Sequence, residues 1–191
     1  MSVNLSSKQI SQPDLVDVIR ETLEETHVDA KHLKLEITES AVMDNAEMAV
    51  RLLRRLKALG VGLSIDDFGT GYSSLGYLHR FPVNTLKIDR SFVGRIGEQN
   101  ENSEIVRTIV SLAENMGMDV VAEGVETLSQ LAHLRGLNCQ YGQGYLFSRP
   151  VDAGSVTAWI SRKPHWQADL FPASKDYFVN AKPVVMHLVS A

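Results

Sequence analysis

The chain has 191 residues and a net charge of −4, and 44% of its residues are hydrophobic, as in an ordinary globular domain. Because only 22% of the residues are charged, disorder of the whole chain is excluded. The negative net charge argues against binding to duplex DNA or to an anionic membrane. The single cysteine, Cys139, excludes a disulfide framework and a cysteine-based zinc site. No apolar run is long enough to cross a bilayer, so we expect a soluble, cytoplasmic domain.

Short strands alternate with amphipathic helices along the chain. Strands are predicted at about 2–5, 33–38, 61–66, 84–89, 118–123 and 138–145. Helices are predicted between them: from Ser11 to about Thr26, over 44–59, over 103–116, and from Thr127 to just before Gly136. This order predicts a parallel sheet covered by helices, either an open doubly wound sheet or a (β/α) barrel.

The helix boundaries carry recognisable capping signals. Asp44, followed three residues later by Glu47, resembles a capping box, and Gly60 stands where a helix-ending glycine belongs. The pair Thr127 and Gln130 predicts a second capping box. These signals mark clear helix boundaries.

Several predicted strands have one apolar face and one polar face. Leu35 and Ile37 alternate with Glu36 and Thr38, and the strands at 61–66 and 84–89 show the same alternation. In an open sheet covered on both sides, both faces should be apolar. The polar face therefore favours a barrel with helices outside and a polar site at one end of the strands.

Polar side chains near the strand ends form a candidate site. Carboxylates that converge in a partly buried place need a compensating cation, and Mg²⁺ or Mn²⁺ prefers carboxylate, amide and water oxygens. Two successive aspartates could serve two metal ions of the kind that promote phosphoryl transfer, and a lysine on the same face would add a fixed positive charge. The candidate residues are Asn4, Glu36, Asp66, Asp67, Lys87 and Glu123.

Other motifs are less specific. The glycine-rich segment 66–76 lacks the Gly-Lys-Ser/Thr ending of a Walker A loop and the third glycine of a dinucleotide fingerprint. The sequence has no G-x-S-x-G nucleophile elbow and no HExxH metal motif. A nucleophilic serine enzyme and a zinc peptidase are therefore not indicated.

At this level of detail the sequence resembles the EAL-domain family of bacterial cyclic-di-GMP phosphodiesterases, over about residues 1–152. The matching strings are VNLS at 3–6, LEITES at 35–40, DDFGTGYSSL at 66–75, LKIDRSFV at 86–93, VVAEGVET at 120–127 and GQGYLFSRP at 142–150. The resemblance implies a TIM-like barrel with a two-metal site and hydrolysis of cyclic-di-GMP to the linear dinucleotide pGpG. It also implies a homodimer and further signalling domains in the same protein.

The resemblance also implies roles for individual residues. Asn4, Glu36 and Asp66 would bind the first Mg²⁺ or Mn²⁺ ion, and Asp66 with Asp67 would bind the second. Glu123 is similar to a metal-linked carboxylate of the family.

Three further residues match family positions outside the main ligand set. Lys87 would contact the attacking water and help to deprotonate it, and Gln143 would hold the surrounding water network. Glu39 is similar to the family glutamate that anchors the DDFGTGYSSL loop, which tends to lie at the dimer contact.

The sequence also departs from the family pattern. The tripeptide Glu-Ala-Leu does not occur, and with it a metal carboxylate and a phosphate-binding arginine are missing. A TIM barrel typically needs about 250 residues, so we expect an incomplete (β/α) barrel with about six of eight strands. The alternative function is a non-catalytic cyclic-di-GMP-binding or interaction module, or an inactive fragment.

The division into domains follows from this match. We expect residues 1–152 to form the barrel core without its first strands, and 153–191 to form the last helix and a tail. Open barrel edges could pair between chains, could be covered by the tail at 176–190, or could stay open. A disordered or lightly docked tail is the alternative.

Overall fold

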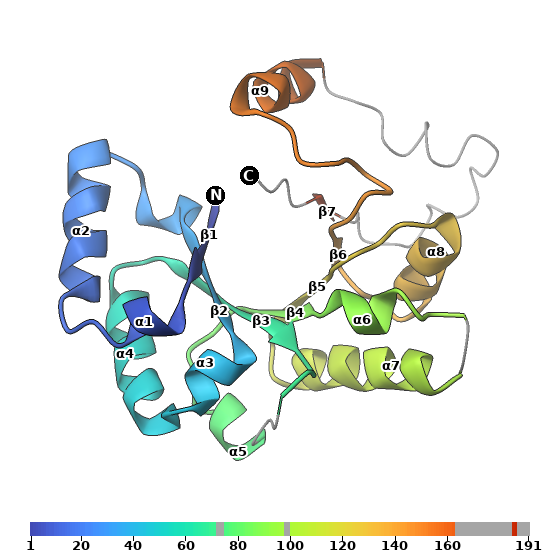
Figure 1. Cartoon of the computed structure of the whole chain (residues 1–191), viewed down its shortest axis with the longest axis horizontal. Coiled ribbons are helices and arrows are strands. Elements are labelled where there is room, and N and C mark those ends of the chain that lie inside the picture. Colours follow the sequence, from blue (N-terminus) through green and yellow to red (C-terminus); the bar gives the residue numbers. More distant parts are fainter. Residues whose placement is uncertain (72–74, 98–99, 163–184, 187–191) are drawn as a thin grey trace. The chain divides into compact units, whose positions relative to one another are not determined.

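A computed structural model describes residues 1–71, 75–97, 100–162 and 185–186 of the chain (Figure 1). The chain divides into two compact units. The first unit comprises Met1–Asp89 and Ser111–Val120, and the second comprises Arg90–Val110 and Val121–Ala191. Each unit is described by itself below.

The first unit is built on a parallel sheet whose strands pair in chain order. These strands are β1 (Ser2–Leu5), β2 (Lys34–Thr38), β3 (Gly62–Phe68) and β4 (Thr85–Ile88). The start of β5 (Asp119–Ala122) also belongs to this unit, and the Asp119 N–H donates to the Asn84 carbonyl at 2.9 Å. Parallel pairing throughout agrees with the predicted α/β class.

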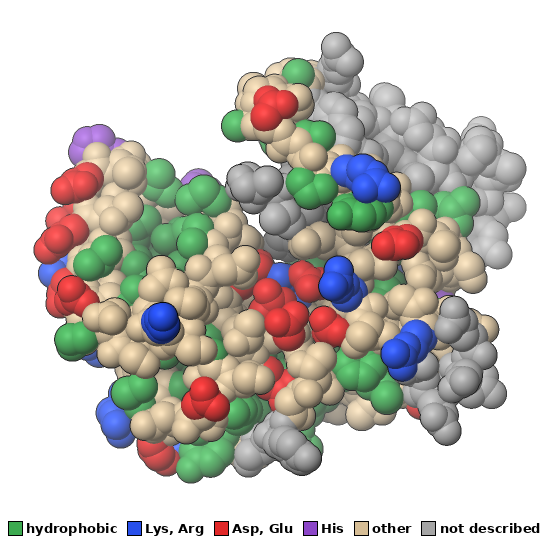
Figure 2. Space-filling view, in the orientation of Figure 1, with side chains coloured by type: hydrophobic (Ala, Val, Ile, Leu, Met, Phe, Trp, Pro, Cys, Tyr) green, Lys and Arg blue, Asp and Glu red, His purple; other side chains and the backbone are tan. Residues whose placement is uncertain are grey.

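Helices connect these strands: α1 (Ser7–Ile10), α2 (Leu15–Thr26), the 3₁₀ helix η1 (Ala30–His32), α3 (Glu39–Met43), α4 (Ala46–Ala58) and α5 (Leu75–Leu78). In α4, Leu53 and Leu56 are buried while Arg54 and Arg55 are exposed, as expected for an amphipathic helix over a sheet. Figure 2 shows acidic side chains along the outer side of α2, at the left of the view. The helices therefore bury one apolar face and turn their charges to water.

The second unit contains α6 (Arg90–Val93), most of α7 (Asn100–Asn115), the end of β5, α8 (Leu128–Gly136), β6 (Tyr141–Gly142), α9 (Ala153–Arg162) and β7 (Val185–Met186). The end of β5 pairs with β6, and β6 pairs with β7, both in parallel. Val185 lies opposite Tyr141 in this register. Apart from Val185–Met186, the segment 176–190 lies outside the described residues.

The two faces of the sheet in the first unit differ in chemistry but are both buried. Apolar side chains that are 2% exposed or less alternate along β2, β3 and β4: Leu35, Ile37, Leu63, Ile65, Leu86 and Ile88. Between them lie four buried polar side chains: Glu36, Ser64, Thr85 and Lys87. The predicted alternation is therefore confirmed, and a buried polar face requires that its groups satisfy one another or a ligand.

Several predicted boundaries differ from the structure. Ser11 does not open a helix but ends α1, and α2 begins after Asp14. The side chain that caps α4 belongs to Asn45, which accepts from the Met48 N–H at 3.1 Å, and not to Asp44. The capping box at Thr127 is confirmed. The sequence analysis did not predict α3, which ends at Met43. Asp44 is the C-cap residue of that helix and not the N-cap of α4.

The sixth predicted strand, 138–145, is reduced to the two residues of β6. The backbone beyond Gly142 leaves the sheet to form a turn, in which the N–H groups of Phe147 and Ser148 both donate to the Gly144 carbonyl.

None of the helices in the described part of the chain combines the length and the apolar character needed to span a bilayer.

Candidate active site

A β-bulge at the end of β3 shapes the acidic part of the site. Ile65 lies opposite Leu86 and Phe68 lies opposite Ile88, so Asp66 and Asp67 together face a single residue of β4. Asp67 has a positive φ of 52°, a conformation that is costly for residues other than glycine. In a regular strand two successive side chains would point to opposite faces.

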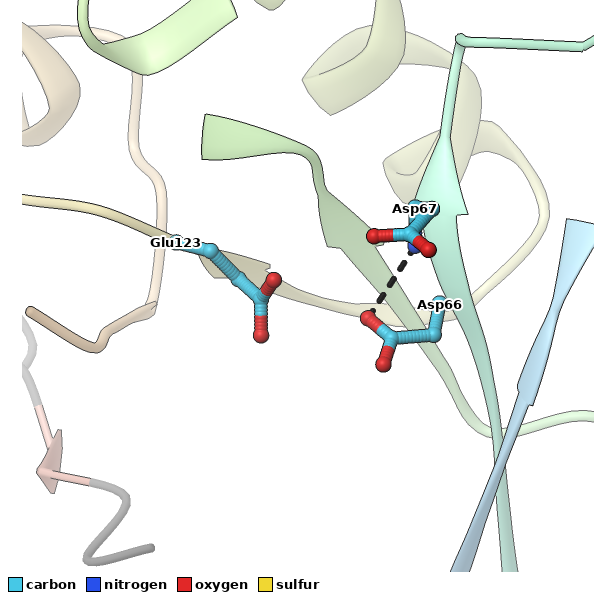
Figure 3. A group of neighbouring side chains, drawn as sticks. All are labelled: Asp66, Asp67 and Glu123. Carbon is cyan, nitrogen blue, oxygen red and sulfur yellow. Dashed lines mark hydrogen bonds between the residues drawn. The ribbon is translucent and has the colours of Figure 1, made fainter. Parts of the chain in front are cut away.

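The bulge places the two aspartates together. Figure 3 shows the carboxyl groups of Asp66 and Asp67 on the same side of β3. The backbone N–H of Asp67 donates to Oδ1 of Asp66 at 3.0 Å, which orients the first carboxylate. The sequence pattern alone, with its period of two, would have separated them.

Lys87 provides the positive charge in this part of the first unit. Its ammonium nitrogen lies 2.7 Å from Oε2 of Glu36 and 3.0 Å from Oδ1 of Asp66. The three side chains are 6%, 10% and 14% exposed. A buried lysine is costly unless it is paired and hydrogen-bonded, and the two carboxylates meet that requirement.

Strand register explains how Lys87 reaches Glu36. Glu36 lies opposite Ser64, and Ser64 lies opposite Thr85, so β3 separates the strands of Glu36 and Lys87. Ser64, whose short side chain is buried, lies between these two strands in the register. Asn4 lies opposite Glu36 on β1 and is exposed, which places its amide at the same level of the sheet.

The carboxyl group of Asp67 experiences an excess of negative charge. Burial, together with the charges of Asp66 and Asp89 and a hydrogen bond with Asp89, raises the pKa of Asp67, and Lys87 opposes this only in part. Asp89 is a neighbour that the sequence analysis did not include in the site. Its position directly after β4 was visible in the sequence, but its approach to Asp67 depends on the bulge.

Glu39 contacts the loop that follows the bulge. It is 1% exposed, and its Oε2 accepts hydrogen bonds from the backbone N–H of Gly69 at 2.8 Å and of Gly71 at 3.4 Å. A Cβ atom at Gly71 would lie 3.2 Å from the Glu39 carboxyl carbon, so glycine keeps this approach open. One buried carboxylate thus holds two backbone groups of the loop.

Glu123 and Gln143 belong to the second unit. Glu123 directly follows β5 and is drawn in Figure 3, and Gln143 directly follows β6. The Gln143 N–H donates to the Ala122 carbonyl at 2.9 Å, and the Gln143 carbonyl accepts from Val125 at 3.0 Å. The two residues therefore follow neighbouring strands at the same level of that unit.

The donor set of the first unit fits a hard divalent cation. Asp66 and Asp67 offer carboxylate oxygens on one side of β3, and burial, together with repulsion from the charges of Asp66 and Asp89, raises the pKa of Asp67. A cation at this place would relieve that repulsion, and oxygen donors suit Mg²⁺ or Mn²⁺. The ammonium group of Lys87 pairs with Glu36 and Asp66 beside these oxygens.

Comparison with known proteins identifies similar sequences. The EAL domain model matches residues 1–150. "Cyclic di-GMP phosphodiesterase NbdA" of Pseudomonas aeruginosa is 46% identical over 160 residues, which are 84% of this chain and 20% of that protein. The chain spans about a fifth to a quarter of the length of the curated relatives at the top of the comparison.

Solved structures agree with this match. The PaMucR phosphodiesterase in complex with c-di-GMP has a TM-score of 0.80 and 44% identity, and the match covers 81% of this chain and 63% of that one. The manganese and cyclic-di-GMP complex of Klebsiella pneumoniae BlrP1 has a TM-score of 0.72 and 34% identity, over 78% of this chain and 38% of that one. The expected α/β fold, part of a TIM-like barrel, is confirmed.

Proposed function

The chain belongs to the EAL-domain family, and we propose that its activity is the metal-dependent hydrolysis of one phosphodiester of cyclic-di-GMP to give pGpG. The observation that carries this proposal is the buried Lys87, whose ammonium group is held between Glu36 and Asp66. The neighbouring strands direct this lysine and both carboxylates toward the same polar face. The names of NbdA and PaMucR as phosphodiesterases support the same reading.

The metal ions would be held by carboxylate and amide oxygens. We assign Asn4, Glu36 and Asp66 to the first ion and Asp66 with Asp67 to the second, and Glu123 is the further carboxylate of the set. When bound, Mg²⁺ or Mn²⁺ supplies an acidified water and counter-charge for the phosphoryl oxygens. The manganese complex of BlrP1 supports the choice of metal.

The remaining residues would act on the water and on the loop. Lys87 holds the attacking water through its ammonium group, whose positive charge favours loss of the water's proton. Gln143 donates to and accepts from the same water network through its amide. Glu39 positions the loop that begins at Gly69, through the hydrogen bonds described above.

A second candidate function is supported by one feature of the sequence. The chain contains no Glu-Ala-Leu segment, which in the family supplies a metal carboxylate and leads to a phosphate-binding arginine. For the chain as it stands, this favours a cyclic-di-GMP-binding or interaction module without turnover. The retention of Lys87, Asp66 and Asp67 favours the enzyme.

We also propose a cytoplasmic homodimer that works with further signalling domains. "Bifunctional diguanylate cyclase/cyclic di-GMP phosphodiesterase MucR" is a relative with two such activities in its name, and the chain covers 24% of it. The loop beginning at Asp66 is the proposed dimer contact. Cys139, the single cysteine of the chain, agrees with a reducing compartment.

Chromatography of the reaction products tests the proposal. The chain is incubated with cyclic-di-GMP and Mg²⁺ or Mn²⁺, in parallel with EDTA and with the Lys87→Ala variant. Formation of pGpG by the wild-type chain alone, and only with metal, is the expected result. If cyclic-di-GMP binds but no pGpG forms, the second candidate function is correct. If cyclic-di-GMP neither binds nor reacts, both candidates are wrong.

A further inference from the structure

The turn that follows β6 has a rigid backbone. Val125 donates its N–H to the Gln143 carbonyl at 3.0 Å and accepts from the Leu146 N–H at 3.0 Å. Gly144 packs so closely that a Cβ atom there would lie 2.2 Å from the Val125 carbonyl oxygen, so only glycine fits. The turn lies between β6 and α9 in Figure 1. The two hydrogen bonds of Val125 hold it at Gln143 and at Leu146.

The side chains of this turn separate into two sets. Phe147 points inward, because its ring lies 3.3 Å from the position of a Cβ atom at Gly142. Tyr145 is 54% exposed, and Arg149 is exposed as well. The guanidinium carbon of Arg149 lies 4.5 Å from the centre of the Tyr145 ring. A stacked arginine–tyrosine pair is thus presented outward on a rigid turn, where it contributes nothing to the core.

The location of the pair suggests a role in ligand binding. Tyr145 is two residues beyond Gln143, which we have assigned to the water network, and the turn follows the carboxyl end of a parallel strand. Ligands of barrel folds bind at that end of the strands. The substrate proposed above carries guanine bases, which offer a flat face and two neighbouring acceptors, O6 and N7.

We propose that Tyr145 and Arg149 form a guanine-recognition element, in which Arg149 donates two hydrogen bonds to O6 and N7 of one base and Tyr145 holds the guanidinium in place. The stack fixes the plane of the guanidinium, so that its edge donors are oriented before the ligand arrives. Adenine has an amino group, a hydrogen-bond donor, where guanine has O6. This amino group would face the N–H donors of the guanidinium, so the second hydrogen bond cannot form. This inference rests on the proposed function, because it takes cyclic-di-GMP as the ligand.

Binding selectivity tests the element. A rapid-filtration binding assay compares cyclic-di-GMP with cyclic-di-AMP for the wild-type chain and for Arg149→Lys, Tyr145→Phe and Tyr145→Ala, in Mg²⁺ and at times before the nucleotides are consumed, as chromatography establishes. The wild-type chain is expected to prefer the guanine ligand by about tenfold or more, the ratio that one bidentate contact supplies. Arg149→Lys should remove most of this preference, because lysine keeps the charge but not the planar fork.

The tyrosine variants separate stacking from a structural role. Tyr145→Phe keeps the ring and should keep the selectivity, whereas Tyr145→Ala should lower it. Arg95→Lys, at an exposed arginine of the same unit, serves as the matched control and should change nothing. Thermal unfolding of each variant establishes that the fold is retained.

The possible failures are distinguishable. If the wild-type chain binds cyclic-di-GMP but does not prefer it, or if Arg149→Lys keeps the preference, the guanine-recognition element is wrong and the proposed function stands. If the wild-type chain binds neither nucleotide, the proposed function fails and the inference fails with it.

Discussion

The ammonium group of Lys87 lies 2.7 Å from a carboxylate oxygen of Glu36, although β3 runs between their two strands. On β3, the residue opposite Glu36 is Ser64, whose side chain is short and fully buried. Because the same ammonium group also lies 3.0 Å from Asp66, it links β2, β3 and β4 on their polar face. The two ion pairs balance the charge of the buried lysine and place its ammonium group beside two carboxylates.

Replacing Lys87 by methionine should destabilise the fold. The variant keeps the length of the side chain but leaves Glu36 and Asp66 buried without a cation, which costs about 3–5 kcal/mol when one partner of a buried pair is removed. Urea unfolding in EDTA measures the loss.

The matched control for this variant is Lys31→Met. Lys31 pairs with Asp29 at 2.6 Å on the surface, where its side chain is 68% exposed, and its removal should cost little. A loss of equal size in the two variants would show that Lys87 is not holding the two carboxylates.

Replacing Asp67 by asparagine should stabilise the metal-free fold at neutral pH. The pKa of Asp67 is raised by burial and by the charges of Asp66 and Asp89, so ionisation is harder in the folded chain than in the unfolded one. Stability due to this group therefore falls as the pH rises from 3.8 through the folded pKa. Asparagine removes the charge and tolerates the positive φ.

Urea midpoints in EDTA between pH 4 and pH 7 measure this effect. The advantage of Asp67→Asn should be greatest at pH 7 and should shrink toward pH 4. Asp29→Asn is the control with the opposite sign, because Lys31 lowers the pKa of Asp29 and the charged form is favoured there. A variant at Asp67 that is less stable than the wild-type chain at pH 7 would contradict the account.

Replacing Glu39 by glutamine should loosen the loop after the bulge. The amide keeps the shape but lacks the charge that strengthens the bonds from Gly69 and Gly71. The difference between charged and neutral hydrogen bonds is about 1 kcal/mol, so the two amides should exchange with deuterium about fivefold faster. Unchanged protection at both glycines, measured by NMR, would show that the carboxylate does not hold the loop.

Ser64 should accept a smaller side chain but not a larger one. Its Oγ is buried and has no hydrogen-bond partner among the described residues, so Ser64→Ala should leave stability unchanged or raise it by up to about 1 kcal/mol. Ser64→Leu should cost roughly 1–3 kcal/mol or more, because it fills the space over which Lys87 reaches Glu36. Thermal unfolding compares the two, and a tolerated leucine would show that the passage over β3 is not tight.

The sequence was sufficient to predict the alternation of strands and helices and the polar face of the sheet. Period-two alternation reports burial directly, and so the positions of Glu36, Ser64 and Lys87 on one face followed from the residues alone. The resemblance to the family led us to expect Glu39 at the loop, which no periodicity would indicate.

The bulge at Asp66 and Asp67 could not be predicted in this way. A bulge changes how many residues of one strand face its partner, and this depends on pairing with β4 rather than on local pattern. The same dependence explains why Asp89 was not included in the site. Likewise, the stacking of Arg149 on Tyr145 depends on how the turn after β6 is held by Val125.

Mass spectrometry of the product formed in water labelled with heavy oxygen tests the central claim most directly. The chain is mixed in excess with cyclic-di-GMP and Mg²⁺, and the reaction is stopped within a single turnover. The account predicts linear pGpG with one heavy oxygen on the newly formed terminal phosphate, since water adds to phosphorus as one ester bond breaks. Recovery of intact cyclic-di-GMP, or a linear product without the label, would contradict hydrolysis by this chain.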